Sequence, residues 1–269
     1  MDSNSLIFLV AMCLLACCTI MLLVWLWATK IKNAGVVDIF WSYNFPVIAV
    51  ILYLLADGFE PRKLLICGMV FLSGLRLGTY LMIRIVSHIG EEEGRYQQLR
   101  KEWEPHPDKK FFGFFQAQAV SNVLLAVPFF IICINTTPGL SVFEYAGAGL
   151  WLVAFLGESI ADQQLKAFKK DPANKGKVCD KGLWNYSRHP NYFFEWLIWV
   201  SYLIFALASP YGYLAVISPA IILYLLLKVT GIPATEEQSI RSKGDLYRAY
   251  QKTTSVFVPW FKKPTNSPS

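Results

Sequence analysis

Seven apolar runs alternate with polar segments along this chain, and each run is long enough to cross a bilayer as a helix. A transmembrane helix needs roughly 20 mostly apolar residues. The runs of this length cover about residues 6–27, 36–55, 64–86, 114–134, 141–162, 191–208 and 212–232. Because they fill most of the chain, the pattern predicts an all-α fold, in which residues 1–269 form one integral membrane domain of about seven transmembrane helices.

The basic residues predict how this bundle lies in the membrane. Of the 25 Lys and Arg residues, 21 lie in four segments, which are 28–35, 87–112, 163–190 and 228–269. The positive-inside rule assigns these segments to the cytoplasm, which places the N-terminus outside and the tail 233–269 inside. This asymmetry explains the formal net charge of +6 without a nucleic-acid partner, and 55% hydrophobic residues argue against a soluble domain.

The segment 182–196 concentrates polar groups at the mouth of an apolar run, where lipid tolerates them poorly. Arg188, Asn191 and Glu195 stand three and four residues apart and therefore share one helical face at the start of the sixth span. Pro190 suits the first turn of a helix, where backbone N–H groups attract anions such as phosphate. The pattern favours a ligand-binding or catalytic task over an ordinary helix entry.

Two more spans carry charges with two interpretations each. In the fifth span, Asp162 and the following Lys166 are either snorkelling interfacial residues or ligands for a ribose and its phosphates. In the third span, Arg76 and Tyr80 are four residues apart, and Arg76 lies deep enough to need a partner. Asp38, near the start of the second span, offers either a structural salt bridge to Arg76 or a functional carboxyl group.

The longest polar segments predict different structures. The charged segment 87–112 predicts a mostly solvated, partly helical connection. After the last span, Thr235 is predicted to open a polar helix with acidic residues in its first turn. The tail is rich in Glu, Arg and Tyr, including Glu236, Glu237, Arg241 and Tyr247.

The residue types expected of several enzyme classes are missing from the pattern. The six cysteines and three histidines lack metal-site spacing, so no metal is predicted. A Rossmann glycine fingerprint, a P-loop and a Ser-His-Asp grouping are also absent from the sequence.

Three segments together carry a family resemblance. They are residues 37–42 (Val-Asp-Ile-Phe-Trp-Ser), 184–196 and 235–260. They resemble the steroid 5-alpha-reductase-like membrane proteins, in the branch known as the DUF1295 family. The similarity covers nearly all the chain after the first helix. It implies a seven-helix bundle that binds NADPH between the later spans and the cytoplasmic loops. Hydride then passes to the β-carbon of an enone whose carbonyl is hydrogen-bonded by an acid.

The resemblance also implies roles for residues. Asn191 and Glu195 match positions at the nicotinamide or ribose, Asp162 contacts the cofactor elsewhere, and Arg188 and Lys166 lie near its phosphates. The remaining residues of the implied cofactor site are Tyr192, Glu236, Glu237, Arg241 and Tyr247. The implied catalytic residues are Asp38, Arg76 and Tyr80. This chain departs from animal-type reductases at the third-span Tyr, whose position holds Leu72 or Ser73.

The sequence therefore predicts a membrane oxidoreductase that uses NADPH to reduce a conjugated C=C bond in a lipophilic enone admitted from the bilayer. Its partners are that substrate and membrane lipids, in the endoplasmic reticulum or a bacterial inner membrane. One alternative is an S-adenosylmethionine-dependent methyltransferase acting on a lipid or a lipidated Cys, since such enzymes carry similar Arg-His-Pro and Glu-Glu elements. The other is a lipid-binding membrane protein without turnover.

Overall fold

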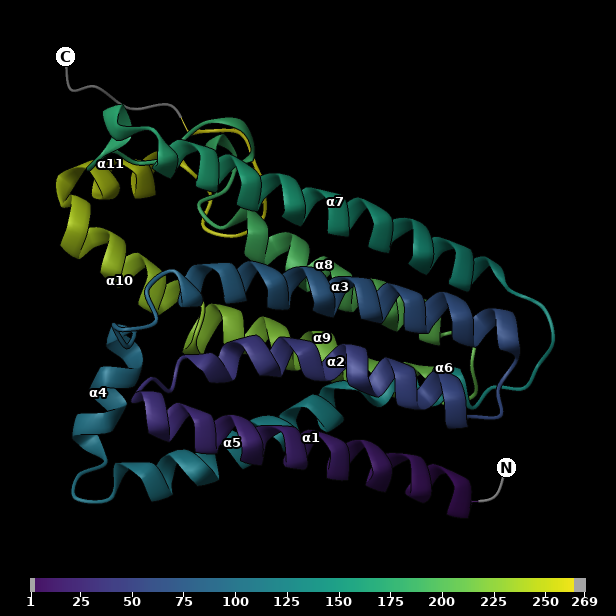
Figure 1. The fold of residues 1–269 in the computed structure, drawn as a ribbon. Coiled ribbons are helices and arrows are strands. Elements are labelled where there is room, and N and C mark those ends of the chain that lie inside the picture. The colour runs from purple at the N-terminus through teal and green to yellow at the C-terminus, as the bar shows by residue number, and fades with distance from the viewer. Residues whose placement is uncertain (1–2, 264–269) are drawn as a thin grey trace. The chain divides into compact units, whose positions relative to one another are not determined.

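The computed structural model describes residues 3–263, and every regular element in that range is a helix (Figure 1). The longer helices are α1 (Ser3–Ile31), α2 (Val36–Leu55), α3 (Glu60–Val86), α5 (Pro107–Leu125), α7 (Val142–Lys170) and α8 (Pro190–Ala206). The shorter ones are α4 (Gly94–Glu102), α6 (Val127–Cys133), α9 (Ile217–Tyr224), α10 (Ile232–Lys243) and α11 (Asp245–Thr253). Single turns are η1 (Pro172–Asn174), η2 (Gly182–Asn185), η3 (Gly212–Val216) and the π-helical η4 (Leu225–Val229). The prediction of an all-α fold is confirmed.

Up to five segments are long and apolar enough to cross a membrane, as in an integral membrane protein. Four are single segments, which are Ser5–Ile31, Val36–Leu55, Glu60–Val86 and Gly212–Lys243. The fifth is α5 with α6, a pair bent by 42°. Of the other predicted spans, α8 has only 17 residues and α7 contains several carboxylates. Seven spans, and the orientation of the termini, stay predictions.

The bend between α5 and α6 divides the predicted span 114–134. Helix α5 ends at Leu125, and Pro128 lies in the first turn of α6. Proline has no backbone N–H and its ring collides with the carbonyl four residues earlier, so a continuous helix through this point is unfavourable.

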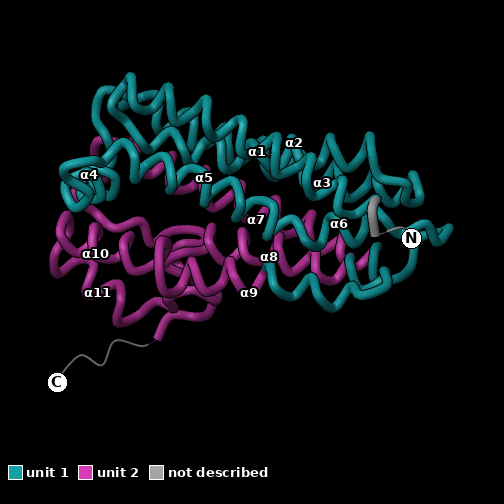
Figure 2. The backbone as a smooth tube through the Cα atoms, turned by 90° about the horizontal axis from the view of Figure 1, so that it is seen from below, with its two compact units in different colours: residues 1–144, 206–218 teal, residues 145–205, 219–269 magenta. Residues whose placement is uncertain are grey.

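The described chain forms two compact units, each assembled from separate parts of the sequence (Figure 2). Unit 1 takes in the chain up to Glu144 and residues 206–218. Unit 2 takes in residues 145–205 and the chain from Pro219 onward. A single membrane domain over residues 1–269 stays a prediction.

In unit 1, α2 packs against both α1 and α3 (Figure 1). Helix α3 approaches α2 closely at two glycines four residues apart. A Cβ at Gly74 would lie 2.4 Å from Cδ of Pro46, and one at Gly78 would lie 2.5 Å from the ring of Tyr43. Small residues at this spacing let two helix backbones come together.

A buried charge fixes the start of α3 in unit 1. Arg62 is 2% exposed and forms a salt bridge with the fully buried Glu144. Its guanidinium also donates hydrogen bonds to the carbonyl oxygens of Asn135 (2.9 Å), Thr137 (2.7 Å) and Gly139 (2.8 Å). A buried charge is tolerated when its donors are satisfied in this way, so Arg62 holds the loop between α6 and α7 in place.

Unit 2 is built on α7 and α8 together with the helices of the tail. Indole N–H groups connect these parts. Trp184 donates to the carbonyl of Ala161 (2.9 Å), and Trp196 donates to the carbonyl of Pro219 (3.2 Å). Because a buried indole N–H needs an acceptor, these bonds fix η2 against α7 and α8 against the start of α9.

Candidate functional site

The predicted site residues fall into two groups, one in each unit. Asp38, Arg76 and Tyr80 lie in unit 1. The ten residues assigned to the cofactor lie in unit 2, on α7, α8 and the tail.

Asp38 lies in the first turn of α2 and is hydrogen-bonded to a residue that the sequence did not single out. The hydroxyl of Tyr96, on α4, donates to its Oδ1 at 2.7 Å. Within residues 3–263, Asp38 and Arg76 form no salt bridge, so that interpretation is wrong. Arg76 and Tyr80 lie one turn apart on α3, and both are partly exposed. The second oxygen of Asp38, Oδ2, has no hydrogen bond to the described chain.

Tyr96 is completely buried, in a segment predicted to be mostly solvated. Burial, together with the nearby Asp38 carboxylate, raises the pKa of Tyr96 well above its ordinary value, so its hydroxyl stays protonated and donates. The signal for this burial is an apolar stripe at Tyr96, Leu99 and Trp103, whose spacing of three and four residues marks one helical face. The surrounding charges hide that stripe in an average over the segment.

Glu92 fixes the same segment to the turn between α1 and α2. Its Oε1 accepts from the Ala34 N–H at 2.8 Å, and both oxygens accept from Arg100 at 2.9 Å. Burial opposes the ionised form, but the hydrogen bonds from Arg100 and Ala34 outweigh it and hold the pKa of Glu92 below its ordinary value. The bidentate ion pair with Arg100 therefore helps to hold the segment that carries Tyr96 against the turn between α1 and α2.

In unit 2, the predicted polar face of α8 is present and is joined to α7. The side-chain amide of Asn191 donates to Oδ1 of Asp162 at 3.3 Å, and Asp162 is 6% exposed. One turn further on, Oε1 of Glu195 accepts from the indole of Trp199 at 3.0 Å. The other oxygens, Oδ1 of Asn191 and Oε2 of Glu195, have no hydrogen bond to residues 3–263. Two partly exposed acceptors thus remain available on one face of an apolar helix.

Tyr192 joins α8 to α10 rather than facing away from the protein. Its hydroxyl is hydrogen-bonded to Oγ1 of Thr235 at 3.1 Å, and its ring stacks on His189 with centroids 5.4 Å apart. The prediction that Thr235 opens α10 is wrong. The helix begins at Ile232, with Pro233 in its first turn, and Thr235 donates to the Gly231 carbonyl. Pro is favoured at this position because its missing N–H would be unpaired there.

Glu236 is the centre of a half-buried network that connects α8 to the tail. Its Oε1 accepts from Nε of Arg188 at 2.6 Å and lies 3.3 Å from Nε2 of His189 and 3.4 Å from the Tyr247 hydroxyl. Its Oε2 accepts from Gln251 at 2.9 Å. Burial lowers the pKa of His189, so the neutral imidazole can donate to this carboxylate. With four donors around its carboxylate, Glu236 connects α10 to the start of α8 and to α11 without any ligand.

The guanidinium of Arg188 is engaged in hydrogen bonds within unit 2. Besides Glu236, it donates from Nη1 to the carbonyls of Gln251 (3.1 Å) and Thr254 (2.6 Å), and it is 9% exposed. Its backbone N–H donates to the Ser255 carbonyl at 2.9 Å. The segments 184–196 and 235–260, read as separate motifs in the sequence, are therefore one structural element.

The remaining predicted cofactor residues lie on the surface of unit 2. Glu237 and Arg241 form an exposed ion pair one turn apart on α10, with side chains 65% and 77% exposed. Lys166 is exposed on α7. The structure therefore brings together Asp162 with Asn191, and Arg188 with Glu236 and Tyr247, but leaves Lys166, Glu237 and Arg241 outside these clusters. Across residues 3–263, no three His, Cys, Asp or Glu side chains are grouped to hold a metal ion.

Comparison with known proteins gives a family without a known activity. The DUF1295 family, described as a protein of unknown function, matches residues 24–254. An uncharacterized protein of Schizosaccharomyces pombe is 26% identical over 271 residues, which cover 87% of this chain and 75% of that protein. No solved structure matches the chain. The matched region includes Asp38 in unit 1 and the α7–α8 polar face in unit 2.

Proposed function

The chain belongs to the DUF1295 family, and from that membership and the polar face of α8 we propose that it is an integral membrane reductase. It uses NADPH to reduce the conjugated C=C bond of a lipophilic enone, as in the steroid 5-alpha-reductase-like proteins that its motifs resemble. The chain crosses the membrane seven times with its C-terminus in the cytoplasm, in the endoplasmic reticulum or a bacterial inner membrane. The substrate enters from the bilayer.

The observation that carries this proposal is the Asp162–Asn191 hydrogen bond with Glu195 one turn away. Because the amide nitrogen of Asn191 is directed at Asp162, its Oδ1 is left to accept from a ligand. Glu195 likewise offers Oε2. Two acceptors one helical turn apart suit the carboxamide and ribose hydroxyl donors of a nicotinamide nucleotide. Polar groups placed within apolar helices are expensive unless they serve a ligand.

The residues of unit 1 suit the substrate carbonyl. Tyr96 donates to Oδ1 of Asp38, so Oδ2 is the oxygen that, once protonated, donates a hydrogen bond to an enone oxygen. That hydrogen bond would stabilise the enolate that forms as the β-carbon accepts hydride, and a proton from water would then add to the α-carbon and complete the reduction. NADPH supplies the hydride when it is bound. The buried phenol of Tyr96 fixes the carboxyl orientation and does not itself reach the substrate in this scheme.

The experiment that tests this function measures thermal unfolding of the detergent-purified protein with NADPH, NADH or S-adenosylmethionine. A ligand at about 100 times its Kd should add roughly 2.7 kcal/mol of stability. NADPH should raise the unfolding temperature of the wild type and of Glu237→Gln, but much less that of Glu195→Gln. The purified protein should then oxidise NADPH in the presence of lipophilic enones, and the loss of NADPH absorbance measures this reaction.

Two results would overturn the proposal. Stabilisation by S-adenosylmethionine alone would favour methyl transfer. No stabilisation by any of the three ligands would favour a lipid-binding protein without turnover.

A further inference from the structure

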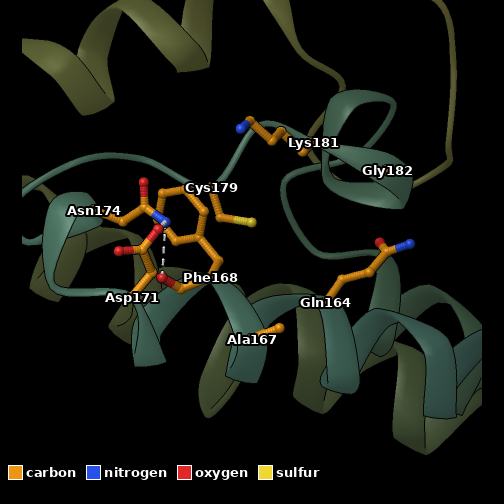
Figure 3. Close-up of a pocket in the computed structure, with 8 residues that line it drawn as sticks. All are labelled: Gln164, Ala167, Phe168, Asp171, Asn174, Cys179, Lys181 and Gly182. Atoms are coloured by element: carbon orange, nitrogen blue, oxygen red, sulfur yellow. Dashed lines mark hydrogen bonds between the residues drawn. The ribbon is translucent and has the colours of Figure 1, made fainter.

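A pocket of about 320 Å³ lies in unit 2, outside the clusters described above (Figure 3). It is formed by the last turns of α7 and by the loop that leads to η2. The side chains that matter below are Gln164, Phe168, Asn174, Cys179 and Lys181. Its volume is in the range of sites for small molecules or parts of cofactors.

The walls of this pocket are fixed by short-range contacts. Oε1 of Gln164 accepts from the Leu183 N–H at 2.9 Å, and the amide of Asn174 donates to the Phe168 carbonyl at 3.0 Å. Gly182 has φ of +59°, and a Cβ there would lie 2.5 Å from the Gln164 carboxamide. Only glycine allows this close approach without displacing the carboxamide. The pocket is therefore a preformed feature.

The pocket offers the groups that recognise adenine. Phe168 projects from α7 toward the segment that carries Cys179 and presents an aromatic ring (Figure 3). Nε2 of Gln164 and Oδ1 of Asn174 have no hydrogen bond to the described residues, which leaves one donor and one acceptor. Carboxamides pair with the N6 and N7 edge of adenine, and aromatic rings stack on nucleobases.

The pocket has one carboxylate, that of Asp171, whose Oδ1 accepts from the Ala173 N–H at 2.9 Å, and positive charge lies beside it. The ammonium of Lys181 forms no salt bridge within residues 3–263. Lys243 is close enough to Cys179 to interact electrostatically with it. Asp180, which follows Cys179, is neutralised by Lys262 at 3.4 Å. An uncompensated ammonium at the rim attracts a phosphate group.

The pocket also lies on the helix that carries the proposed cofactor contact. Asp162 and Phe168 are six residues apart on α7, which at 1.5 Å per residue is about 9 Å along the helix axis. A dinucleotide in contact with Asn191 at one end is long enough to reach this pocket with the other.

We propose that this pocket binds the adenosine end of the nucleotide cofactor, with Phe168 against the adenine ring and Lys181 at the 2′-phosphate. The inference rests on the proposed function, because it names the part of the same cofactor that unit 2 holds furthest from Asn191. It assigns the preference for NADPH over NADH to Lys181.

Cys179 provides a readout that does not depend on activity. The thiol lines the pocket and is 7% exposed, and burial raises its pKa, so alkylation is slow and depends on access. The experiment measures the rate of Cys179 alkylation by mass spectrometry in the full-length protein. The probes are adenosine 2′,5′-bisphosphate, ADP and S-adenosylmethionine, none of which contains nicotinamide. The variants are Lys181→Gln and, as the matched control on the same loop, the exposed Lys175→Gln.

Adenosine 2′,5′-bisphosphate should slow alkylation at least tenfold, at concentrations where ADP has little effect. Lys181→Gln should abolish that difference, and Lys175→Gln should keep it. If NADPH raises the unfolding temperature but no adenosine probe protects Cys179, the pocket assignment is wrong while the reductase stands. Protection by S-adenosylmethionine but not by the bisphosphate would overturn the 2′-phosphate assignment and favour methyl transfer. Equal protection by ADP and the bisphosphate would overturn only the assignment of the 2′-phosphate to Lys181 and would leave the adenosine site in place.

Discussion

The network around Glu236 can be tested with a control one residue away. Glu236→Gln keeps the shape of the side chain but removes the charge that Arg188 faces in a half-buried site. Glu237→Gln makes the same change in an ion pair whose side chains are 65% and 77% exposed. Because both residues lie on α10, a general effect of the substitution on helix stability is common to both variants.

The expected magnitudes differ because the two environments differ. Glu236 is 16% exposed and Arg188 9% exposed, and their contact is a hydrogen bond of 2.6 Å. A hydrogen bond to a charged group contributes about 1.5–3 kcal/mol, and a buried charge left without its counter-ion costs more. An exposed pair one turn apart contributes only about 0.3–0.5 kcal/mol. We therefore expect Glu236→Gln to lose about 2–3 kcal/mol and Glu237→Gln less than about 0.5 kcal/mol.

The assay is thermal unfolding in detergent, followed by tryptophan fluorescence. For a chain of this size about 1 kcal/mol corresponds to roughly 2–4 °C, so Glu236→Gln should unfold at least about 3 °C below Glu237→Gln. Arg188→Met and the double variant complete a cycle, whose coupling should exceed about 1.5 kcal/mol. Equal unfolding temperatures for the two Gln variants, or additive effects in the cycle, would refute a structural role for this network.

Three smaller perturbations test local contacts. Gly182→Ala should destabilise the protein by about 1–3 kcal/mol more than Gly176→Ala. Both glycines have positive φ (+59° and +79°), but only at position 182 would a Cβ meet another side chain, that of Gln164. Equal losses of stability would contradict this close approach. The lowered pKa of Glu92 means that its stabilisation is present above the ordinary value and is lost as the pH falls through the lowered pKa. Glu92→Gln should therefore flatten the acid side of a plot of unfolding temperature against pH, while the exposed Glu91→Gln keeps the wild-type slope. Tyr96→Phe should cost about 1.5–3 kcal/mol, because it removes a hydrogen bond to a carboxylate; an unchanged unfolding temperature would show that this bond contributes nothing.

Apolar length predicted most of the helices closely. The run 36–55 corresponds to α2 at both ends, and the runs 141–162 and 191–208 lie at α7 and α8. Length and hydropathy do not report on interruptions, so the bend at Pro128 was not predicted. The predicted start of α10 at Thr235 lies three residues after the observed start at Ile232, because Pro233 in the first turn marks the beginning of the helix instead.

The candidate site was predicted only where its residues share one helix. Asn191 and Glu195 stand on one face because helical periodicity puts them there. The partners of Glu236 include Arg188, 48 residues away, and Gln251, 15 residues away, and no sequence spacing relates them. Tyr96 reaches Asp38 across 58 residues through a segment whose charge made it look solvated. Such contacts depend on how helices pack, and periodicity within one helix does not contain that information.

The salt bridge of Arg62 also bears on how the chain is made. Arg62 and Glu144 are 82 residues apart, so a ribosome that adds about 5–20 residues per second exposes the arginine for about 4–16 s before its partner exists. The carbonyls of Asn135, Thr137 and Gly139, which share the guanidinium, also arrive late. Through this interval the start of α3 must stay where water or lipid headgroups can solvate the charge. We therefore expect the start of α3 to reach its final packing only after the loop that follows α6 has been synthesised.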